Sequence, residues 1–394
     1  MKDTATRSRE LFELYEGVTD RSVEQEQAVD LRTGKSLEEI YGASQWRLTW
    51  RKFVRNRAAL AGGVVIVLFY LAALLADWIA PYTLTTRFTK NIHMPPQRVH
   101  LFNGARFQPF VYDYDQEFGA DLRRTYTLNR EQVVPLQFFA RGEPYKLCGL
   151  FPANVHLFQG AEGKPVALLG TDRQGRDMFS RILLGSQISL TIGLVGVLLS
   201  LSIGAVLGIA SGYYAGKVDN IIQRAIELIR SFPSIPLWMA LSAAIPLNWT
   251  VLQTYFAISI ILSLIGWTWL ARQLRGKVLA LRSEDFVLAA KLAGASDRWI
   301  IFRHLIPATL GHIVVVSTLA MPAMILAETS LSYLGLGLRP PVTSWGVLIQ
   351  ESQNYQSLAL YPWVFTPAAA IAICILAFSY LGDGLRDAID PYTI

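Results

Sequence analysis

Six stretches of this sequence run for about 20 residues without a charged side chain, and they limit what the chain can fold into. These stretches are Ala58–Ala76, Ile188–Ser211, Ser231–Leu252, Leu252–Ala271, Leu305–Ala327 and Trp363–Gly382. A helix rises about 1.5 Å per residue, so each stretch is long enough to cross a hydrocarbon core roughly 30 Å thick. The sequence therefore predicts an all-α polytopic membrane protein with six transmembrane helices.

The polar start of the chain predicts an anchor that is not cleaved. Residues 1–43 are charged and poor in aromatic side chains, so we expect a cytoplasmic tail with some helix at Arg9–Glu16. The first apolar run begins far later than in a signal peptide. Residues 44–80 are expected to contain a short helix and transmembrane helix 1. The short helix either lies in the headgroup region or extends helix 1 into the cytosol.

The distribution of Lys and Arg predicts the orientation in the membrane, because short cytoplasmic loops retain positive charge. Basic residues precede span one and also lie between spans two and three and between spans four and five: Arg47, Arg51, Lys52, Arg55, Arg57, Lys217, Arg224, Arg272, Arg275, Lys277, Arg282, Lys291, Arg298 and Arg303. The loop between spans five and six has only Arg339. Both termini are therefore expected in the cytoplasm. The net charge of +6 reflects this orientation and does not indicate nucleic-acid binding.

Residues 81–169 form the longest loop and are rich in aromatic side chains, which argues against disorder. We expect them to form an extracytoplasmic insertion between helices 1 and 2. Residues 170–394 would then be the core that contains transmembrane helices 2–6.

The chain shows no pattern for covalent chemistry. The segment Thr33–Ser36 (TGKS) resembles the end of a phosphate-binding loop, but Val29 stands where the first glycine is required. The two cysteines, Cys148 and Cys374, are too few for a metal site, and a disulfide between a loop and a span is not expected. The sequence therefore predicts a non-catalytic chain without a cofactor or metal of its own.

One polar segment, residues 283–304, interrupts the apolar runs between spans four and five. Its residues predict a helix, a sharp bend and a second helix: acidic residues suit a helix start, small residues form a stripe, and Gly294 suits a left-handed cap. The candidate docking residues are Glu284, Asp285, Phe286, Ala289, Ala290, Lys291, Gly294, Ala295, Ser296, Asp297 and Arg298. From the residues alone, this hairpin either docks on a cytoplasmic partner or packs on its own membrane domain.

The same segment resembles the cytoplasmic loop of binding-protein-dependent ABC importer permeases. That loop has the pattern Glu-Ala-Ala, three residues, Gly, nine residues, Ile, any residue, Leu-Pro. The residues that match in spacing are Ala289, Ala290, Gly294 and Pro307. The departures are Leu288 for glutamate, His304 for isoleucine and Ile306 for leucine. The missing glutamate puts one polar contact to a partner in doubt.

Further segments resemble the dipeptide and oligopeptide branch of these permeases, and specifically its C-type subunit. They are GTDRQGRDMFSRILLGSQISL, GYYAGKVDN, SFPSIP, LAETSLSYLGLGLRPPVTSWGVLI and GDGLRDAIDP. Together the resemblance covers about residues 45–80 and 168–394. Residues 81–169 are longer than in the common peptide members, so oligosaccharides or other small solutes remain an alternative to short peptides.

The resemblance implies a type I ABC importer permease fold in the cytoplasmic (inner) membrane of a prokaryote. It implies as partners a second homologous permease, two ATPase subunits that bind ATP and Mg, and an extracytoplasmic binding protein, in addition to membrane lipid. The hairpin would dock on an ATPase. A self-sufficient secondary transporter is the alternative from another class, but neither an internal inverted repeat nor an intramembrane acid chain is visible.

Three residues of span five are candidates for the pathway or a gate: Glu328, Pro322 and Met324. An ionisable group inside a membrane is costly unless it is paired or faces water, so Glu328 is either functional or bonded to backbone or Ser330.

Proline kinks, including those of Pro233, Pro236 and Pro246, either shape the pathway or serve packing. The segment before span two, with Arg176, Asp177 and Arg181, is expected to form a turn and an amphipathic helix near the headgroups on the outer surface. Its role is either structural or contact with the substrate. The charges of Asp383, Arg386 and Asp387 are expected to anchor span six.

Overall fold

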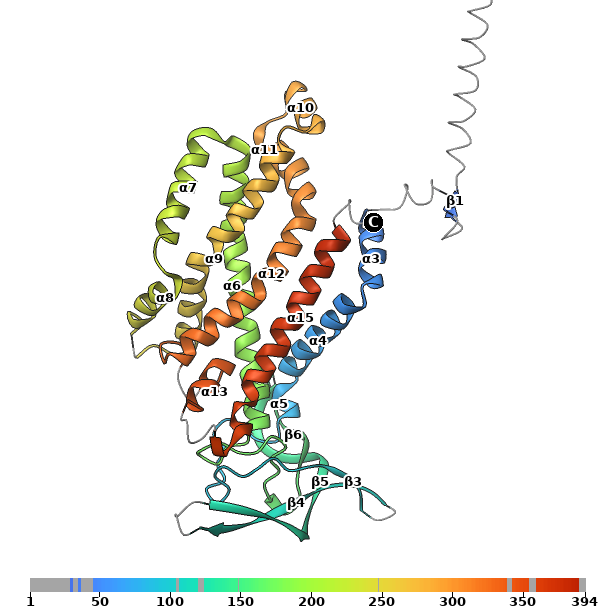
Figure 1. Ribbon diagram of the computed structural model, residues 1–394, viewed down its shortest axis with the longest axis vertical. Coiled ribbons are helices and arrows are strands. Elements are labelled where there is room, and N and C mark those ends of the chain that lie inside the picture. Colours follow the sequence, from blue (N-terminus) through green and yellow to red (C-terminus); the bar gives the residue numbers. More distant parts are fainter. Residues whose placement is uncertain are drawn as a thin grey trace, which may run out of the picture. The chain divides into compact units, whose positions relative to one another are not determined.

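The computed structural model describes residues 29–30, 35–36, 45–103, 106–119, 124–147, 149–246, 248–338, 342–353 and 359–389 (Figure 1). The elements, in chain order, are β1 Val29–Asp30, β2 Lys35–Ser36, α3 Gln45–Arg55, α4 Arg57–Leu74, α5 Ala76–Ile79, β3 His100–Asn103, β4 Arg106–Phe118, β5 Arg124–Leu147, β6 Phe151–Gly160, η1 Ala161–Gly163, α6 Met178–Tyr214, α7 Gly216–Arg230, α8 Ser234–Ala243, α9 Val251–Leu281, α10 Asp285–Leu292, α11 Asp297–Ile300, η2 Ile301–Leu305, α12 Ile306–Tyr333, α13 Trp345–Glu351, η3 Pro362–Phe365 and α15 Thr366–Ile389. η2 is a π-helical turn, whereas η1 and η3 are 3₁₀ turns. The expected helix at Arg9–Glu16 and Cys148 lie outside the described residues. Arg57–Arg386 forms one compact unit, and α3, β1 and β2 belong to a second.

Five helical stretches are long and apolar enough to cross a membrane: Arg57–Leu74, Met178–Tyr214, Val251–Leu281, Asp297–Tyr333 and Pro362–Ile389. They contain five of the six expected spans. The expected span Ser231–Leu252 is wrong as one membrane-length helix, because its described residues contain only the 10-residue helix α8 and the start of α9. The break lies between α8 and α9: α8 ends at Ala243, and Pro246 follows shortly after and cannot continue the helix. Pro236 is tolerated because it lies in the first turn.

Helices α6 and α9 run parallel, because successive positions along α6 meet successive positions along α9. Near the middle of both helices, the Ser263 hydroxyl donates to the Gly196 carbonyl oxygen at 3.0 Å. Near their end, a Cβ on Gly212 would lie 2.8 Å from Cβ of Val278. Glycines spaced four residues apart on α6 let the two backbones approach closely. Since both helices run in one direction, α7 and α8 return the chain between them (Figure 1).

Residues 100–160 form a four-stranded antiparallel sheet in the order β3-β4-β5-β6. The expectation of an all-α chain is therefore wrong for this segment. Aromatic residues on β4, such as Tyr112 and Tyr114, alternate along the strand, which is the period of a β-strand. Val111 and Val134 belong to its small buried core. Within the unit Arg57–Arg386, the sheet lies at the end of the helices opposite α10 and α11 (Figure 1).

Buried hydrogen bonds join this sheet to the chain that follows α5. His156 on β6 is buried, and its Nδ1 lies 2.6 Å from the carbonyl oxygen of Ala80. Its Nε2 lies 3.0 Å from the carbonyl oxygen of Glu143 on β5. The Gln159 side-chain amide donates to the Pro81 carbonyl oxygen at 2.9 Å. The sheet therefore packs as part of the same unit as the helices.

Candidate functional site

The hairpin formed by α10 and α11 is built by its local sequence. Helix α10 begins at Asp285, directly after Glu284. Gly294 has a φ of 81°, a left-handed conformation that glycine adopts at little cost. Ser296 caps α11, and its hydroxyl accepts a hydrogen bond from the Trp299 backbone N–H at 3.4 Å. The prediction of a helix, a sharp bend and a second helix is confirmed.

The stripe of small residues lines an open groove of ≈ 590 Å³ between the two arms of the hairpin. The residues that line it are Phe286, Ala289, Ala290, Ala293, Gly294, Ala295, Ser296, Trp299 and His304. The ring centroid of His304 lies 4.8 Å from that of Trp299 and 5.8 Å from that of Phe286. Because alanine and glycine add little bulk, another surface can approach the hairpin backbone closely.

Large apolar side chains are exposed around this groove. Leu292, at the end of α10, is 90% exposed, and Trp299 is 48% exposed. Leu288, which stands where the family pattern has glutamate, is 45% exposed. The acidic and basic candidates Glu284, Asp285 and Arg298 are also exposed. Contiguous exposed apolar surface with a charged rim is typical of a protein-binding surface.

Two candidate docking residues make contacts inside the chain, with Tyr213 at the end of α6. The Tyr213 hydroxyl donates to Oδ1 of Asp297 at 2.7 Å. Nζ of Lys291 lies 5.0 Å from the centroid of the Tyr213 ring, in cation–π geometry. On the buried side of the hairpin, Val287 and Ile300 are fully buried in the apolar cluster that also contains Tyr213. The hairpin therefore has one exposed side and one side fixed to α6.

The pathway candidates on α12 do not converge on one site. Met324 lines an apolar groove of ≈ 250 Å³ between α6, α8, α9 and α12, together with two indole rings, those of Trp238 and Trp269. Pro322 lies inside α12 but does not line this groove. No charged side chain lines it in the described part of the chain. This groove can accept an apolar group but offers little to a charge.

Glu328 is fully buried and does not line that groove. Its carboxylate accepts hydrogen bonds from the hydroxyls of Ser332, at 2.7 Å, and Ser189, at 3.4 Å. Ser189 also accepts a hydrogen bond from the Trp345 backbone N–H at 3.0 Å. Glu328 thus joins α12 to α6 and to the start of α13. The sequence alternative of a bond to Ser330 does not describe this arrangement, because the partners are Ser332 and Ser189.

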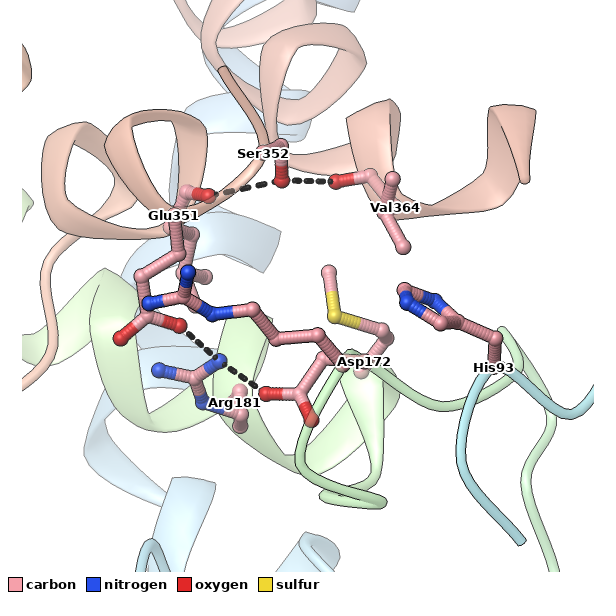
Figure 2. Close-up of a pocket in the computed structure, with 9 residues that line it drawn as sticks. His93, Asp172, Arg181, Glu351, Ser352 and Val364 are labelled. Carbon is pink, nitrogen blue, oxygen red and sulfur yellow. Dashed lines mark hydrogen bonds and ion pairs between the residues drawn. The ribbon is translucent and has the colours of Figure 1, made fainter. Parts of the chain in front are cut away.

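A buried ion network fixes the other end of α13 to the start of α6. Figure 2 shows Arg181 between Asp172 and Glu351, and Nη1 of Arg181 lies 2.7 Å from Oδ2 of Asp172 and 2.7 Å from Oε2 of Glu351. Arg176 contacts the same two oxygens at 2.7 and 2.6 Å. The four side chains are between 2% and 11% exposed. Two positive and two negative charges therefore balance in a buried environment.

The expectation of a separate amphipathic helix before span two, with Arg176, Asp177 and Arg181 on it, is wrong. All three are buried, and α6 begins directly at Met178 with Asp177 as its cap. Burial raises the pKa of the Asp177 carboxyl to about 6, although hydrogen bonds from Ser180 favour the charged form. Arg176 and Arg181 face Asp172 and, on α13, Glu351, and these opposite charges offset the cost of burying the two arginines.

Sequence reasoning missed Tyr213, Glu351 and the glycine spacing of α6. A buried tyrosine at the end of a span carries no local signal of its contact with Asp297, which is 84 residues away. Glycines at positions 204, 208 and 212 do carry a signal, because small residues four apart are typical of close helix packing in membranes.

Two family models match the chain in order. Residues 44–96 match the N-terminal TM domain of oligopeptide transport permease C. Residues 204–394 match the binding-protein-dependent transport system inner membrane component. The second match contains the hairpin, α12 and α13.

Three relatives cover most of the chain. The oligopeptide transport system permease protein OppC of Bacillus subtilis is 30% identical over 88% of this chain and 90% of its own. The dipeptide transport system permease protein DppC of Lactococcus lactis is 34% identical over 87% and 89%. The glutathione transport system permease protein GsiD of Pectobacterium atrosepticum is 32% identical over 88% and 91%. On these similarities, the chain belongs to the family of inner membrane components of binding-protein-dependent transport systems.

Proposed function

We propose that this chain is the non-catalytic permease subunit of an ATP-driven importer of short peptides. Three similar proteins are named for oligopeptides, dipeptides and glutathione, which is itself a tripeptide. The groove lined by Met324, Trp238 and Trp269 suits apolar parts of such a substrate. The names of these relatives favour peptides over oligosaccharides.

In this proposal, the chain pairs with a second permease and receives substrate from an extracytoplasmic binding protein. Two ATPase subunits hold ATP and Mg, and the hairpin docks on one of them. Helices α7 and α8 together complete a sixth crossing, since α6 and α9 run parallel. The basic residues near the hairpin and before α4 support a topology with both termini in the cytoplasm and residues 81–169 outside.

The observation that carries the proposal is the exposed apolar surface of the hairpin. Leu292 is 90% exposed at a polar end of the helices, where a lone chain gains nothing from an apolar side chain in water. A groove that small residues keep open lies beside it. An ATPase surface that covers both would remove this apolar area from water.

Leu292→Arg is expected to release the ATPase without unfolding the chain, because the side chain is exposed and its loss affects only a partner. The chain is purified from its native membrane in mild detergent, and co-purifying subunits are quantified by mass spectrometry. We expect the ATPase to fall by about tenfold or more, the equivalent of roughly 1.4 kcal/mol of binding energy. The second permease should remain.

Leu150→Arg is the matched control, because Leu150 is 74% exposed and lies before β6, far along the chain from the hairpin. This variant should retain the ATPase. If Leu292→Arg retains it equally well, the hairpin is not the docking surface. If the wild-type chain purifies alone and still transports, the secondary-transporter alternative stands instead.

A further inference from the structure

We propose that Tyr213 is the positioning residue that transmits movement of the docked hairpin to α6. This inference rests on the proposed function, because it assumes that a partner moves the hairpin. It adds the route by which that movement enters the membrane helices. Tyr213 lies in the last turn of α6 and is 6% exposed, so its ring is enclosed by the elements around it.

Both arms of the hairpin hold the same ring. From α11, Asp297 accepts the hydrogen bond of the Tyr213 hydroxyl at 2.7 Å. From α10, Nζ of Lys291 lies 5.0 Å from the ring centroid. A third contact comes from the end of α9, where Nη1 of Arg282 donates to the Tyr213 carbonyl oxygen at 3.4 Å. A hydrogen bond to a charged acceptor is stronger than a neutral one, so the bond to Asp297 dominates the polar contacts.

The apolar surroundings of Tyr213 make the junction stiff. The ring belongs to a buried cluster that draws on α6, α9, α10, α11 and η2: Ile209, Tyr213, Val278, Val287, Ile300 and Leu305. Four of these side chains are fully buried, so little space is left for the hairpin to slide over the ring. A displacement of the hairpin therefore displaces the end of α6 with it.

Behind the ring, α6 and α9 are packed backbone to backbone. A Cβ on Gly212 would lie 2.9 Å from the Arg275 carbonyl oxygen, and a Cβ on Gly208 would lie 2.6 Å from the Ala271 carbonyl oxygen. The Arg275 guanidinium also contacts Asp219 of α7 twice, at 2.6 Å each. Because α6 and α9 are packed in this way, a force applied at Tyr213 moves the two helices together.

The hairpin is also joined covalently to the bundle. Helix α11 continues into α12 through the π-helical turn η2, Ile301–Leu305. Leu305 of this turn belongs to the same buried cluster as Tyr213. The side-chain contacts at Tyr213 therefore add a route to α6 that the covalent chain does not provide.

Tyr213→Phe tests the inference, because it keeps the ring and removes only the hydroxyl. The complex that co-purifies with its ATPase is placed in lipid nanodiscs, and hydrogen–deuterium exchange is measured with and without ATP and Mg²⁺. In wild type, nucleotide should change exchange both in the hairpin and in the last turn of α6. In Tyr213→Phe, the hairpin response should persist while the α6 response falls by about threefold or more.

Tyr214→Phe is the matched control, since Tyr214 is the neighbouring tyrosine and is 49% exposed. It should respond as wild type does. Asp297→Ala removes the same hydrogen bond from the other side, whereas Asp297→Asn keeps an acceptor and should restore most of the response. Combining Tyr213→Phe with Asp297→Ala should cause no further loss, because residues that act through one bond are not additive.

The outcomes separate the two proposals. In one outcome, nucleotide changes hydrogen–deuterium exchange in the wild-type hairpin but not in α6. In another, it changes exchange in α6 equally in wild type and Tyr213→Phe. Either result shows that the inference about Tyr213 is wrong, while hairpin docking stands. If nucleotide leaves the wild-type hairpin unchanged, the proposed docking function fails and the inference fails with it. If Tyr213→Phe does not fold, the two Asp297 variants decide on the same criteria.

Discussion

Glu351→Gln is expected to destabilise the folded chain by about 3–5 kcal/mol, because it leaves two buried arginines to share one carboxylate. Arg176 and Arg181 contact both Asp172 and Glu351 at 2.6–2.7 Å, and all four side chains are at most 11% exposed. Without the Glu351 charge, one of the two buried positive charges is left uncompensated. The free energy of unfolding is measured on purified chain in mixed micelles, by titration with a denaturing detergent.

The control is Glu227→Gln, which makes the same chemical change in a solvated pair. Arg224 Nη1 lies 2.8 Å from Glu227 Oε2, but the side chains are 76% and 50% exposed. We expect less than about 1 kcal/mol there. The double variant Arg176→Gln/Glu351→Gln removes one charge of each sign and should recover part of the loss. Equal effects of Glu351→Gln and Glu227→Gln would contradict the buried-charge explanation.

This ion network also marks a limit of prediction from the sequence. Arg176 and Arg181 are recognisable as charges just before an apolar run, and the simplest place for such charges is the headgroup region. Their partner Glu351 lies 170 residues from Arg181. Helical spacing identifies neighbours three or four residues apart, and it carries no information about a distant carboxylate. Burial of these charges could therefore not be predicted.

The hairpin was predictable because its structure depends on neighbouring residues. A cap at Ser296 and a left-handed turn at Gly294 need only the few residues around them. The apolar runs were predictable for a similar reason, since hydropathy alone identifies a helix that can span a membrane. Which side of the hairpin contacts α6 was not predictable, because that contact involves Tyr213, far away in the sequence.

Two errors arose where a local signal was present but composition was weighted more heavily. The run Ser231–Leu252 is uncharged, yet Pro233 separates α7 from α8 and Pro246 follows the end of α8. In residues 100–160, aromatic residues were taken as burial material, while their alternation along β4 indicates a strand. In both segments, backbone chemistry and periodicity decide the structure more than hydrophobicity does.

Gly208→Leu is expected to prevent normal packing of α6 against α9, at or above the upper end of the roughly 1–3 kcal/mol that overpacking costs. Even the first added atom would lie 2.6 Å from the Ala271 carbonyl oxygen and 3.0 Å from its Cα. These are backbone atoms, so no side chain can rotate away to make room. The helices must separate, and the groove lined by Met324 and Trp269 must change with them. The detergent titration used for Glu351→Gln measures the loss.

Gly276→Leu is the matched control, because Gly276 lies within α9 and a Cβ there would meet nothing within 4 Å. Leucine favours helix over glycine, so this variant should be neutral or more stable by about 0.5–1 kcal/mol. The contrast separates packing from helix propensity, since both variants make the same change inside a helix. If Gly208→Leu is as stable as Gly276→Leu, α6 and α9 do not pack backbone to backbone. The parallel arrangement that requires α7 and α8 to return the chain would then lose its main support.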